Sequence, residues 1–455
     1  MQIKKADLTN GPINRTIFSF AIPLIIGSMI QVLFNMADQI VLGQMAGSGA
    51  VASVGACSNS IHVIISTLQG LSVGVTILVS RSIGAGEHDR TRRIISTAIL
   101  TAVGLGLIGG VGGIALSTPL LRLTNCPENV FRGAKIYITI YLASTPVIIL
   151  YNFAAAILRV TGDSKRPSLY LIFAGALNVV MNVILCLVMT EKVAAVAIAT
   201  LASQALGAFL TIRRLCKVED EYRLDLKHLV FDGAVFGKIM RYGVPSAVNS
   251  AVYPIANMLI QSNVNAFDPV NGTATAGYAA ASNLNGLLSS ISVGFSHTVG
   301  AMVGQNVGAE KPERVRQSIR YGLLWGTSLT FVASMLLFVA RHFLLRLYLP
   351  DSPEALEYGL TYMWCMTLPY ALIPIQQIFG QVLNAYGYSL FASICSLLST
   401  ILFRPLYIYT VFAANPSFHV LLLLFPVSWA LLGVFTGAMF AYVHTRYLHG
   451  KLRKL

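Results

Sequence analysis

A loop that occurs twice decides the fold of this chain. The sequence SIGAGEHDRTRR spans residues 82–93, and NVGAEKPERVRQ spans residues 306–317. Alignment of the two loops places Gly84 on Gly308. Other pairs at nearly the same spacing are Arg90 with Arg314, Pro23 with Pro245, Asn35 with Asn257 and Gly162 with Gly387. Because the spacing stays nearly constant, the sequence predicts an internal duplication.

The composition places both copies in a membrane. The 455 residues are 55% hydrophobic and 11% charged, with a mean hydropathy of +0.69, whereas a soluble domain carries about 25% charged residues. A transmembrane helix needs roughly 20 apolar residues. Twelve blocks meet this need: about 16–45, 51–80, 94–121, 134–158, 167–190, 193–212, 235–266, 275–306, 319–345, 358–385, 388–413 and 417–443. The predicted class is an all-α integral membrane protein with twelve transmembrane helices.

The duplication also predicts how the helices are grouped. Six spans in each copy return the chain to its starting side, so the copies are related by a pseudo-two-fold axis along the membrane normal. We expect an N-lobe at 1–213 (helices 1–6), a polar cytoplasmic linker at 214–234 and a C-lobe at 235–455 (helices 7–12). Two such lobes enclose a cavity, and rocking of one lobe against the other gives alternating access.

The net charge of +14 reflects membrane topology rather than nucleic-acid binding. With a cytoplasmic N-terminus, 25 of the 32 Lys and Arg residues would lie on the cytoplasmic side and six on the other, with Arg404 inside a span. This bias follows the positive-inside rule. It predicts a multi-pass protein of the plasma membrane (the bacterial inner membrane), with both termini in the cytoplasm.

Enzyme and cofactor motifs are lacking in the sequence. The six cysteines are scattered, without the spacing of a disulfide framework or metal site. We find no HExxH, P-loop or GxSxG motif. The sequence therefore predicts a protein that is not an enzyme and needs no cofactor. Without a nucleotide site, transport would be driven by an ion gradient.

Asp38 is the one acidic residue of 18 that falls within a predicted span. A carboxylate at mid-bilayer costs on the order of 2.5–3.5 kcal/mol, so it marks a functional-site hypothesis. The matching residue of the second copy is Ile260, which makes the acid specific to the N-lobe. Two alternatives remain: Asp38 only bonds to neighbouring helices, or it lies near the outer interface on a helix kinked at Pro23.

Three uncharged side chains on other predicted helices are candidates to complete a cation site with Asp38. Asn178 and Asn182 lie at i and i+4 on one helix, and Thr200 lies on the next. Neutral oxygens are ligands that Na⁺ accepts, although they would serve equally as interhelical hydrogen-bond partners. The candidate residues of a substrate cavity are Gln31, Phe34, Asn35, Tyr151 and Asn152.

Other polar residues of the spans receive a structural interpretation. His62 and His297 are expected to be hydrogen-bonded rather than to relay protons. Arg404 is expected to extend its head group to the interface or to pack between helices, and anion binding is the less favoured alternative.

Four stretches together resemble the multidrug and toxic compound extrusion (MATE) family. They are NGPINRTIFSFAIPLIIGSMIQVLFNMADQIVLGQMAG from residue 10, GLSVGVTILVSRSIGAG from residue 70, LRVTGDSKRPSLY from residue 158 and VGQNVGAEKPERVR from residue 303. The resemblance covers nearly the whole chain. It implies a prokaryotic-branch transporter whose essential intramembrane acid lies in the N-lobe.

The resemblance also implies residue roles. Pro23 matches the first-helix proline, the hinge, and Asp38, Asn178 and Thr200 match residues around a Na⁺ or proton site. Members of this branch commonly have a second aspartate where this chain has Asn182. That departure favours Na⁺, because a proton mechanism with two coupled acids does not carry over.

The predicted function is therefore a cation-coupled antiporter, driven by Na⁺ or H⁺, that exports amphipathic, mostly cationic organic compounds. The alternative is a lipid-linked oligosaccharide flippase, which would need basic residues along its cavity. The predicted partners are small organic cations or drugs, a monovalent coupling cation and membrane lipid, with no nucleic acid. The chain is expected to act as a monomer.

Overall fold

The computed structural model describes residues 8–123, 128–218, 222–267, 273–349 and 352–448, and every regular element in these ranges is helical. Within these ranges, nine helices are long and apolar enough to cross a membrane. Two further helices, 131–143 and 145–160, meet at a bend of 44° and pass the same test when taken together. The predicted membrane class is confirmed, and all twelve predicted blocks fall on helices.

By packing, the chain forms two compact units. Unit 1 contains Ile26–Ala251, and unit 2 contains Thr9–Ile25 together with Val252–Leu455. The division therefore falls within the first helix of each copy rather than at the linker. The predicted lobes follow the sequence repeat instead of the packing, and their boundaries stay a prediction.

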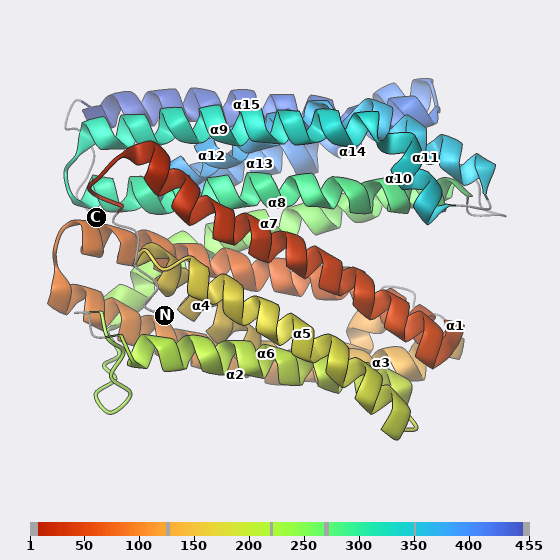
Figure 1. The fold of residues 1–455 in the computed structure, drawn as a ribbon, viewed down its shortest axis with the longest axis horizontal. Helices are drawn as coiled ribbons and strands as arrows, with labels where there is room; N and C mark the ends of the chain where they lie inside the picture. Colours follow the sequence, from red (N-terminus) through yellow and green to blue (C-terminus); the bar gives the residue numbers. More distant parts are fainter. Residues whose placement is uncertain (1–7, 124–127, 219–221, 268–272, 350–351, 449–455) are drawn as a thin grey trace. The chain divides into compact units, whose positions relative to one another are not determined.

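In unit 1, α6 packs against α3, α4 and α5, and α2 packs against α3 and α4 (Figure 1). The unit is built from most of α1 (Ile13–Gly84), α2 (His88–Leu123), α3 (Glu128–Ala143), α4 (Thr145–Val160), α5 (Lys165–Val188), α6 (Lys192–Cys216) and the first part of α7 (Gly233–Asn265).

In unit 2, α8 packs against α9, α11 and α12, and α15 packs against α11 and α12 (Figure 1). After the end of α7 come α8 (Thr273–Gly308), α9 (Pro312–Val339), α10 (Arg341–Tyr348), α11 (Pro353–Met366), the 3₁₀ turn η1 (Pro369–Leu372), α12 (Ile373–Ala385), α13 (Ser389–Leu397), the π-helix η2 (Leu398–Leu402), α14 (Phe403–Tyr407), the π-helix η3 (Ile408–Phe412) and α15 (Phe418–Leu448). The predicted block 358–385 is interrupted at η1, where Pro369 cannot continue an α-helical hydrogen-bond pattern.

Helix α1 changes its packing partners just after Pro23. On the N-terminal side, Phe18 lies edge-on to Phe295 of α8, with ring centroids 6.2 Å apart, and to Trp325 of α9, at 5.1 Å. On the other side, a Cβ added to Gly27 would lie 2.9 Å from the Cβ of Ser168 in α5. The boundary of the units follows Ile25, two residues past the proline. A proline inside a helix removes one backbone hydrogen bond, so this is a natural place for the helix to bend.

The duplication is preserved in close helix contacts. A Cβ added to Gly70 of α1 would lie 2.5 Å from the Cα of Ala247 in α7, within unit 1. A Cβ added to Gly294 of α8 would lie 2.4 Å from Cγ1 of Ile25 in α1, within unit 2. The repeat places Gly294 on Gly70 and Ala247 on Ile25. Each second helix thus packs against the first half of the first helix of the other copy.

The repeated loop also keeps its backbone conformation. Gly86 has φ 71° and the matching Glu310 has φ 54°, which is the one positive φ of a non-glycine residue in the described ranges. Gly162 and its match Gly387 have φ 86° and 79°. A positive φ strains any residue with a Cβ, so the turn geometry is retained even where glycine is not.

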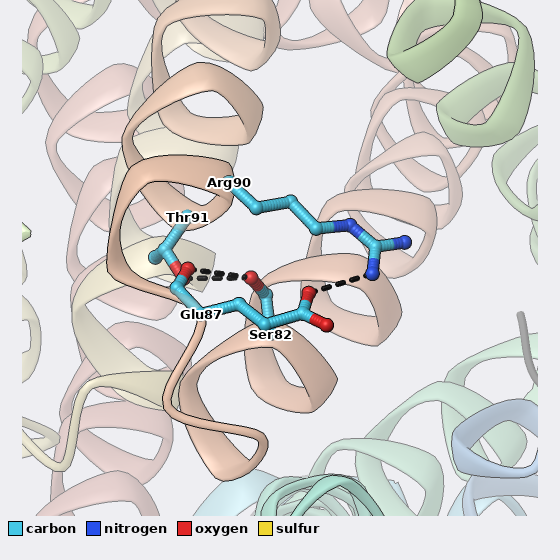
Figure 2. A network of polar contacts seen from close by, with 4 residues as sticks. All are labelled: Ser82, Glu87, Arg90 and Thr91. Carbon is cyan, nitrogen blue, oxygen red and sulfur yellow. Dashed lines mark hydrogen bonds and ion pairs between the residues drawn. The ribbon is translucent and has the colours of Figure 1, made fainter.

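The side chains of the two loops make different contacts. In the first loop, Thr91 Oγ1 donates to Ser82 Oγ at 2.7 Å, and Arg90 pairs with Glu87 at 2.6 Å (Figure 2). In the second loop, Arg314 Nη1 donates instead to the backbone carbonyl of Gly11 at 2.9 Å. These two bonds of the first loop stay within the loop, whereas the bond of Arg314 reaches the segment that leads into α1.

Candidate functional site

The predicted residues of α5 and α6 form one buried cluster in unit 1, which we call the amide cluster (Asn178, Asn182 and Thr200). Asn178 Nδ2 donates to Thr200 Oγ1 at 3.4 Å, and Asn182 Nδ2 donates to Asn178 Oδ1 at 3.3 Å. Thr200 Oγ1 in turn donates to the backbone carbonyl of Val196 at 3.0 Å. Both asparagines are buried, with exposed fractions of 6% and 0%. The i, i+4 spacing brings the two amides to one face, and the packing of α5 on α6 adds the hydroxyl (Figure 1).

The amide cluster offers neutral oxygens without a negative charge of its own. Amide and hydroxyl oxygens can ligate a hard cation, but a buried cation also needs a counter-charge. Among the described side chains, no three His, Cys, Asp or Glu residues lie close enough together to hold a metal ion. A cation held here would therefore depend on a carboxylate from outside the cluster.

Asp38, the predicted source of that carboxylate, lies on α1 in unit 1, but its side chain is outside the described residues, as is that of Asn35. The backbone register of α1 is nevertheless informative. Gly27 lies against Ser168, and a Cβ added to Gly175 would lie 2.1 Å from the ring of Phe34. The two contacts are seven residues apart on α1 (27 and 34) and seven residues apart on α5 (168 and 175), so the two helices run in the same direction. This register puts the helical turn of residue 38 level with the turn of Asn178.

The structure places the remaining cavity candidates in unit 1 as follows. Gln31 is exposed, and Phe34 packs on the backbone of Gly175. The hydroxyl of Tyr151 donates to the backbone carbonyl of Pro167 at 3.3 Å. Asn152 Nδ2 donates to the carbonyl of Ile148 on its own helix at 2.9 Å. Phe34 is thus next to the amide cluster along α5, and the cavity role of all five candidates stays a prediction.

Arg404 is buried between helices, which is one of its two sequence-based interpretations. It is 2% exposed, so the other interpretation, a head group that extends to the membrane interface, does not hold. Instead, Nη1 donates to Asn257 Oδ1 at 3.1 Å and Nε donates to Ser428 Oγ at 3.4 Å. The hydropathy of a span cannot separate a buried arginine from an interfacial one. The sequence had singled out Asn257 only as the repeat match of Asn35, without a link to Arg404.

The two candidate histidines lie in different units, His62 on α1 and His297 on α8, and both are exposed. The expectation that they are hydrogen-bonded rather than proton-relaying stays a prediction.

Comparison with known proteins decides the family. The profile of the MatE family matches residues 23–184 and 245–410. The chain belongs to the MatE family. The two matched segments begin at Pro23 and Pro245, the prolines that the repeat aligns, and they are nearly equal in length. This confirms the resemblance seen in the sequence, and it makes the chain a membrane transporter.

Relatives of this MatE chain are similar over most of their length. A "Probable multidrug resistance protein YpnP" from Bacillus subtilis is 25% identical over 410 residues, covering 87% of this chain and 88% of that protein. A protein named "FAD transporter" from Shewanella oneidensis is 25% identical over 397 residues, covering 83% and 84%. A solved structure described as "Crystal structure of MATE in complex with MaL6" has a TM-score of 0.88 at 19% identity, covering 98% of each chain. This likeness confirms the predicted fold of twelve helices in two six-helix lobes.

Proposed function

We propose that this MatE transporter exports organic compounds from the cytoplasm, driven by a monovalent cation bound beside α5. The observation that carries the proposal is the amide cluster, because Asn178, Asn182 and Thr200 are in contact and lie level with the α1 turn of Asp38. The name of the relative YpnP supports a drug-like substrate. The proposal includes a plasma-membrane location, cytoplasmic termini and a monomeric transporter.

The proposed site couples the ion to the substrate through competition. Asp38 supplies the negative charge and the amide cluster supplies neutral oxygen ligands. Cation binding there would favour one facing state of the transporter, and substrate binding would favour the other. A helix that bends at Pro23 would let the α1 turn of Asp38 shift relative to residues 9–25.

One coupling cation suffices energetically. A monovalent cation that moves down a potential of about 100 mV contributes roughly 2.3 kcal/mol. A tenfold concentration ratio adds about 1.4 kcal/mol. Together they support a substrate gradient of several hundredfold.

Asn182 favours Na⁺ over H⁺ as the coupling ion. Asn182 is fully buried, and its side chain contacts Asn178. A neutral amide can ligate Na⁺, but it cannot exchange a proton as a second carboxylate would. The proposed stoichiometry is one Na⁺ for each substrate.

Amphipathic organic cations remain the proposed main substrates, since Asp38 supplies a negative charge that a cationic substrate could compete for. A lipid-linked oligosaccharide flippase is a weaker candidate. Its pyrophosphate would need several basic side chains, and Arg404 is the only Lys or Arg residue among the described residues that are buried. One relative is named for FAD, an anionic compound, so anionic cargo is a second candidate class.

The test is export of a fluorescent organic cation from cells that express the protein. Asp38→Asn keeps the size of the side chain and removes its charge, so efflux should fall to the level of cells without the transporter. Asp225→Asn is the matched control, because Asp225 is an exposed linker acid whose carboxyl pKa is lowered by a hydrogen bond from His228. Efflux by Asp38→Asn at the wild-type rate would contradict the proposal.

A further inference from the structure

Unit 2 buries a positive charge at Arg404. Arg404 makes two hydrogen bonds, to Asn257 and Ser428, and no ion pair with any carboxylate that the structure describes. A guanidinium carries five N–H donors, so most of its donors are not used by these two bonds. Burial of an uncompensated charge costs several kcal/mol. Within a membrane span, such a residue marks a functional site.

The helix around Arg404 is built irregularly. Arg404 lies in the five residues of α14, between the π-helices η2 and η3, and is followed by Pro405. Stretches of π-helix are rare and occur frequently at functional sites. Pro405 removes one more backbone donor from the helix. The helix is therefore irregular on both sides of the buried charge.

Aromatic rings cover the guanidinium. Its carbon lies 5.0 Å from the ring centroid of Phe425 and 5.9 Å from that of Tyr253. Phe425 neighbours Trp429 at 6.0 Å, and Trp429 lies edge-on to Tyr370 at 5.3 Å. Such rings pack well against a flat apolar body. We call Arg404, Asn257, Tyr253 and Phe425 the arginine cluster.

The repeat relates the arginine cluster to the amide cluster. The family match ends at residue 184 in the first copy and at residue 410 in the second, and this spacing, one residue longer than that of Gly162 and Gly387, aligns Asn178 with Arg404. This spacing also separates the first residues of α6 and α15. In both copies, the fifth-helix side chain donates to a hydroxyl on the sixth helix at 3.4 Å, which is Thr200 in one and Ser428 in the other.

The two copies therefore differ in charge at two pairs of equivalent positions. Where the first copy has Asp38, the second has the fully buried Ile260. Where the first copy has a neutral amide on its fifth helix, the second has Arg404. The second copy thus has the basis of an anion site at the position where the first is proposed to hold a cation.

We propose that the arginine cluster binds an organic anion. A carboxylate or phosphate group pairs with the guanidinium of Arg404, which matches the geometry of both groups. The aromatic body of the ligand packs on Tyr253 and Phe425. The site would add anionic aromatic compounds to the cargo of the proposed exporter, but binding to it does not depend on ion coupling at Asp38.

The test is equilibrium binding of two dyes to the purified full-length protein in detergent, followed by fluorescence anisotropy. Fluorescein and rhodamine 6G share a xanthene ring system but carry opposite charge. Arg404→Gln should weaken fluorescein binding at least about tenfold, which corresponds to about 1.4 kcal/mol. Its affinity for rhodamine 6G should stay the same or rise. Arg404→Lys, which keeps the charge but loses the planar fork, should fall between wild type and Arg404→Gln.

Arg341→Gln is the matched control. Arg341 also belongs to unit 2, and its guanidinium lies 4.0 Å from the ring centroid of Phe338. This variant should bind both dyes as the wild type does. Unchanged fluorescein binding by Arg404→Gln would overturn the proposal, as would an equal loss of both dyes.

Displacement of bound fluorescein from the wild-type protein tests the anion site without any variant. Benzoate and phenyl phosphate should displace bound fluorescein, and their relative potency shows which oxyanion the site prefers. Benzyl alcohol, which has the ring without the charge, should not compete. Equal competition by benzyl alcohol, or no fluorescein binding at all, would contradict the anion site. Because no ion gradient is present, these outcomes are separate from failure of the Asp38 efflux test.

Discussion

The fifth helix of the first copy is α5, and that of the second copy runs from α13 to η3. The two helices begin with the same hydrogen bond but differ in charge further along. In unit 1, α5 buries the neutral amides of Asn178 and Asn182, whereas in unit 2 α14 buries the guanidinium of Arg404. At the start of these helices, Ser168 and Ser393 still donate to the equivalent carbonyls at 3.0 and 2.9 Å. Packing and turn geometry have therefore been retained since the duplication, while a few buried polar residues have diverged.

The largest expected effect comes from substitutions at the close helix contacts that both copies share. Gly70→Ala would place a Cβ 2.5 Å from both the Cα of Ala247 and the carbonyl oxygen of Ser246. Because backbone cannot rotate away, the helices must separate, and we expect a loss of about 3 kcal/mol, at the upper end for overpacking. Gly294→Ala meets Cγ1 of Ile25 at 2.4 Å rather than backbone, and a rotamer change of Ile25 would relieve part of this contact, so its loss should be smaller, about 2 kcal/mol. Thermal unfolding of the purified variants measures both.

Gly104→Ala is the control for this pair, because a Cβ there would meet nothing within 4 Å. It should be neutral or slightly stabilising, since alanine favours helix over glycine. Equal losses of stability for the Gly70 and Gly294 variants would contradict the expectation that a contact with backbone is costlier than a contact with a side chain.

A second prediction concerns the difference in charge between the two clusters. Arg404→Met replaces a buried charge by an apolar side chain of similar length, and such replacements are often neutral or stabilising. We expect a gain of up to about 2 kcal/mol. Asn178→Leu removes neutral hydrogen bonds instead and should cost about 1 kcal/mol. Denaturation midpoints of the two variants in the same detergent show whether each substitution raises or lowers stability. A strong loss of stability for Arg404→Met would mean that the arginine serves stability rather than binding.

The smallest expected effect lies in the duplicated loops. Arg314→Gln loses charged hydrogen bonds to the carbonyls of Gly11 and Asn10 and should cost about 1–2 kcal/mol. Arg90→Gln loses an exposed ion pair with Glu87 and should cost less than about 1 kcal/mol. Hydrogen exchange should show faster amide exchange near the start of α1 in the Arg314 variant only. Equal exchange in both variants would contradict the difference between the loops.

The sequence predicted features that depend on local spacing. Apolar blocks fell on helices, and the i, i+4 spacing of Asn178 and Asn182 brought their amides together. It could not predict that α1 changes partners after Ile25, because that depends on packing against α8 and α9, far along the chain. It also left two positions open for Arg404, at the interface or between helices, since its burial depends on Asn257 and Ser428 from two other helices.

Dye efflux in everted membrane vesicles tests the proposed coupling most directly. A Na⁺ gradient and a pH gradient are imposed separately on vesicles with wild-type protein, Asp38→Asn and Asn182→Asp. We predict that the Na⁺ gradient drives transport by the wild type, that neither gradient drives Asp38→Asn, and that Asn182→Asp gains a response to pH. Transport by Asp38→Asn at the wild-type rate would contradict coupling at Asp38, and wild-type transport driven by pH alone, without any effect of Na⁺, would contradict the assignment of the ion.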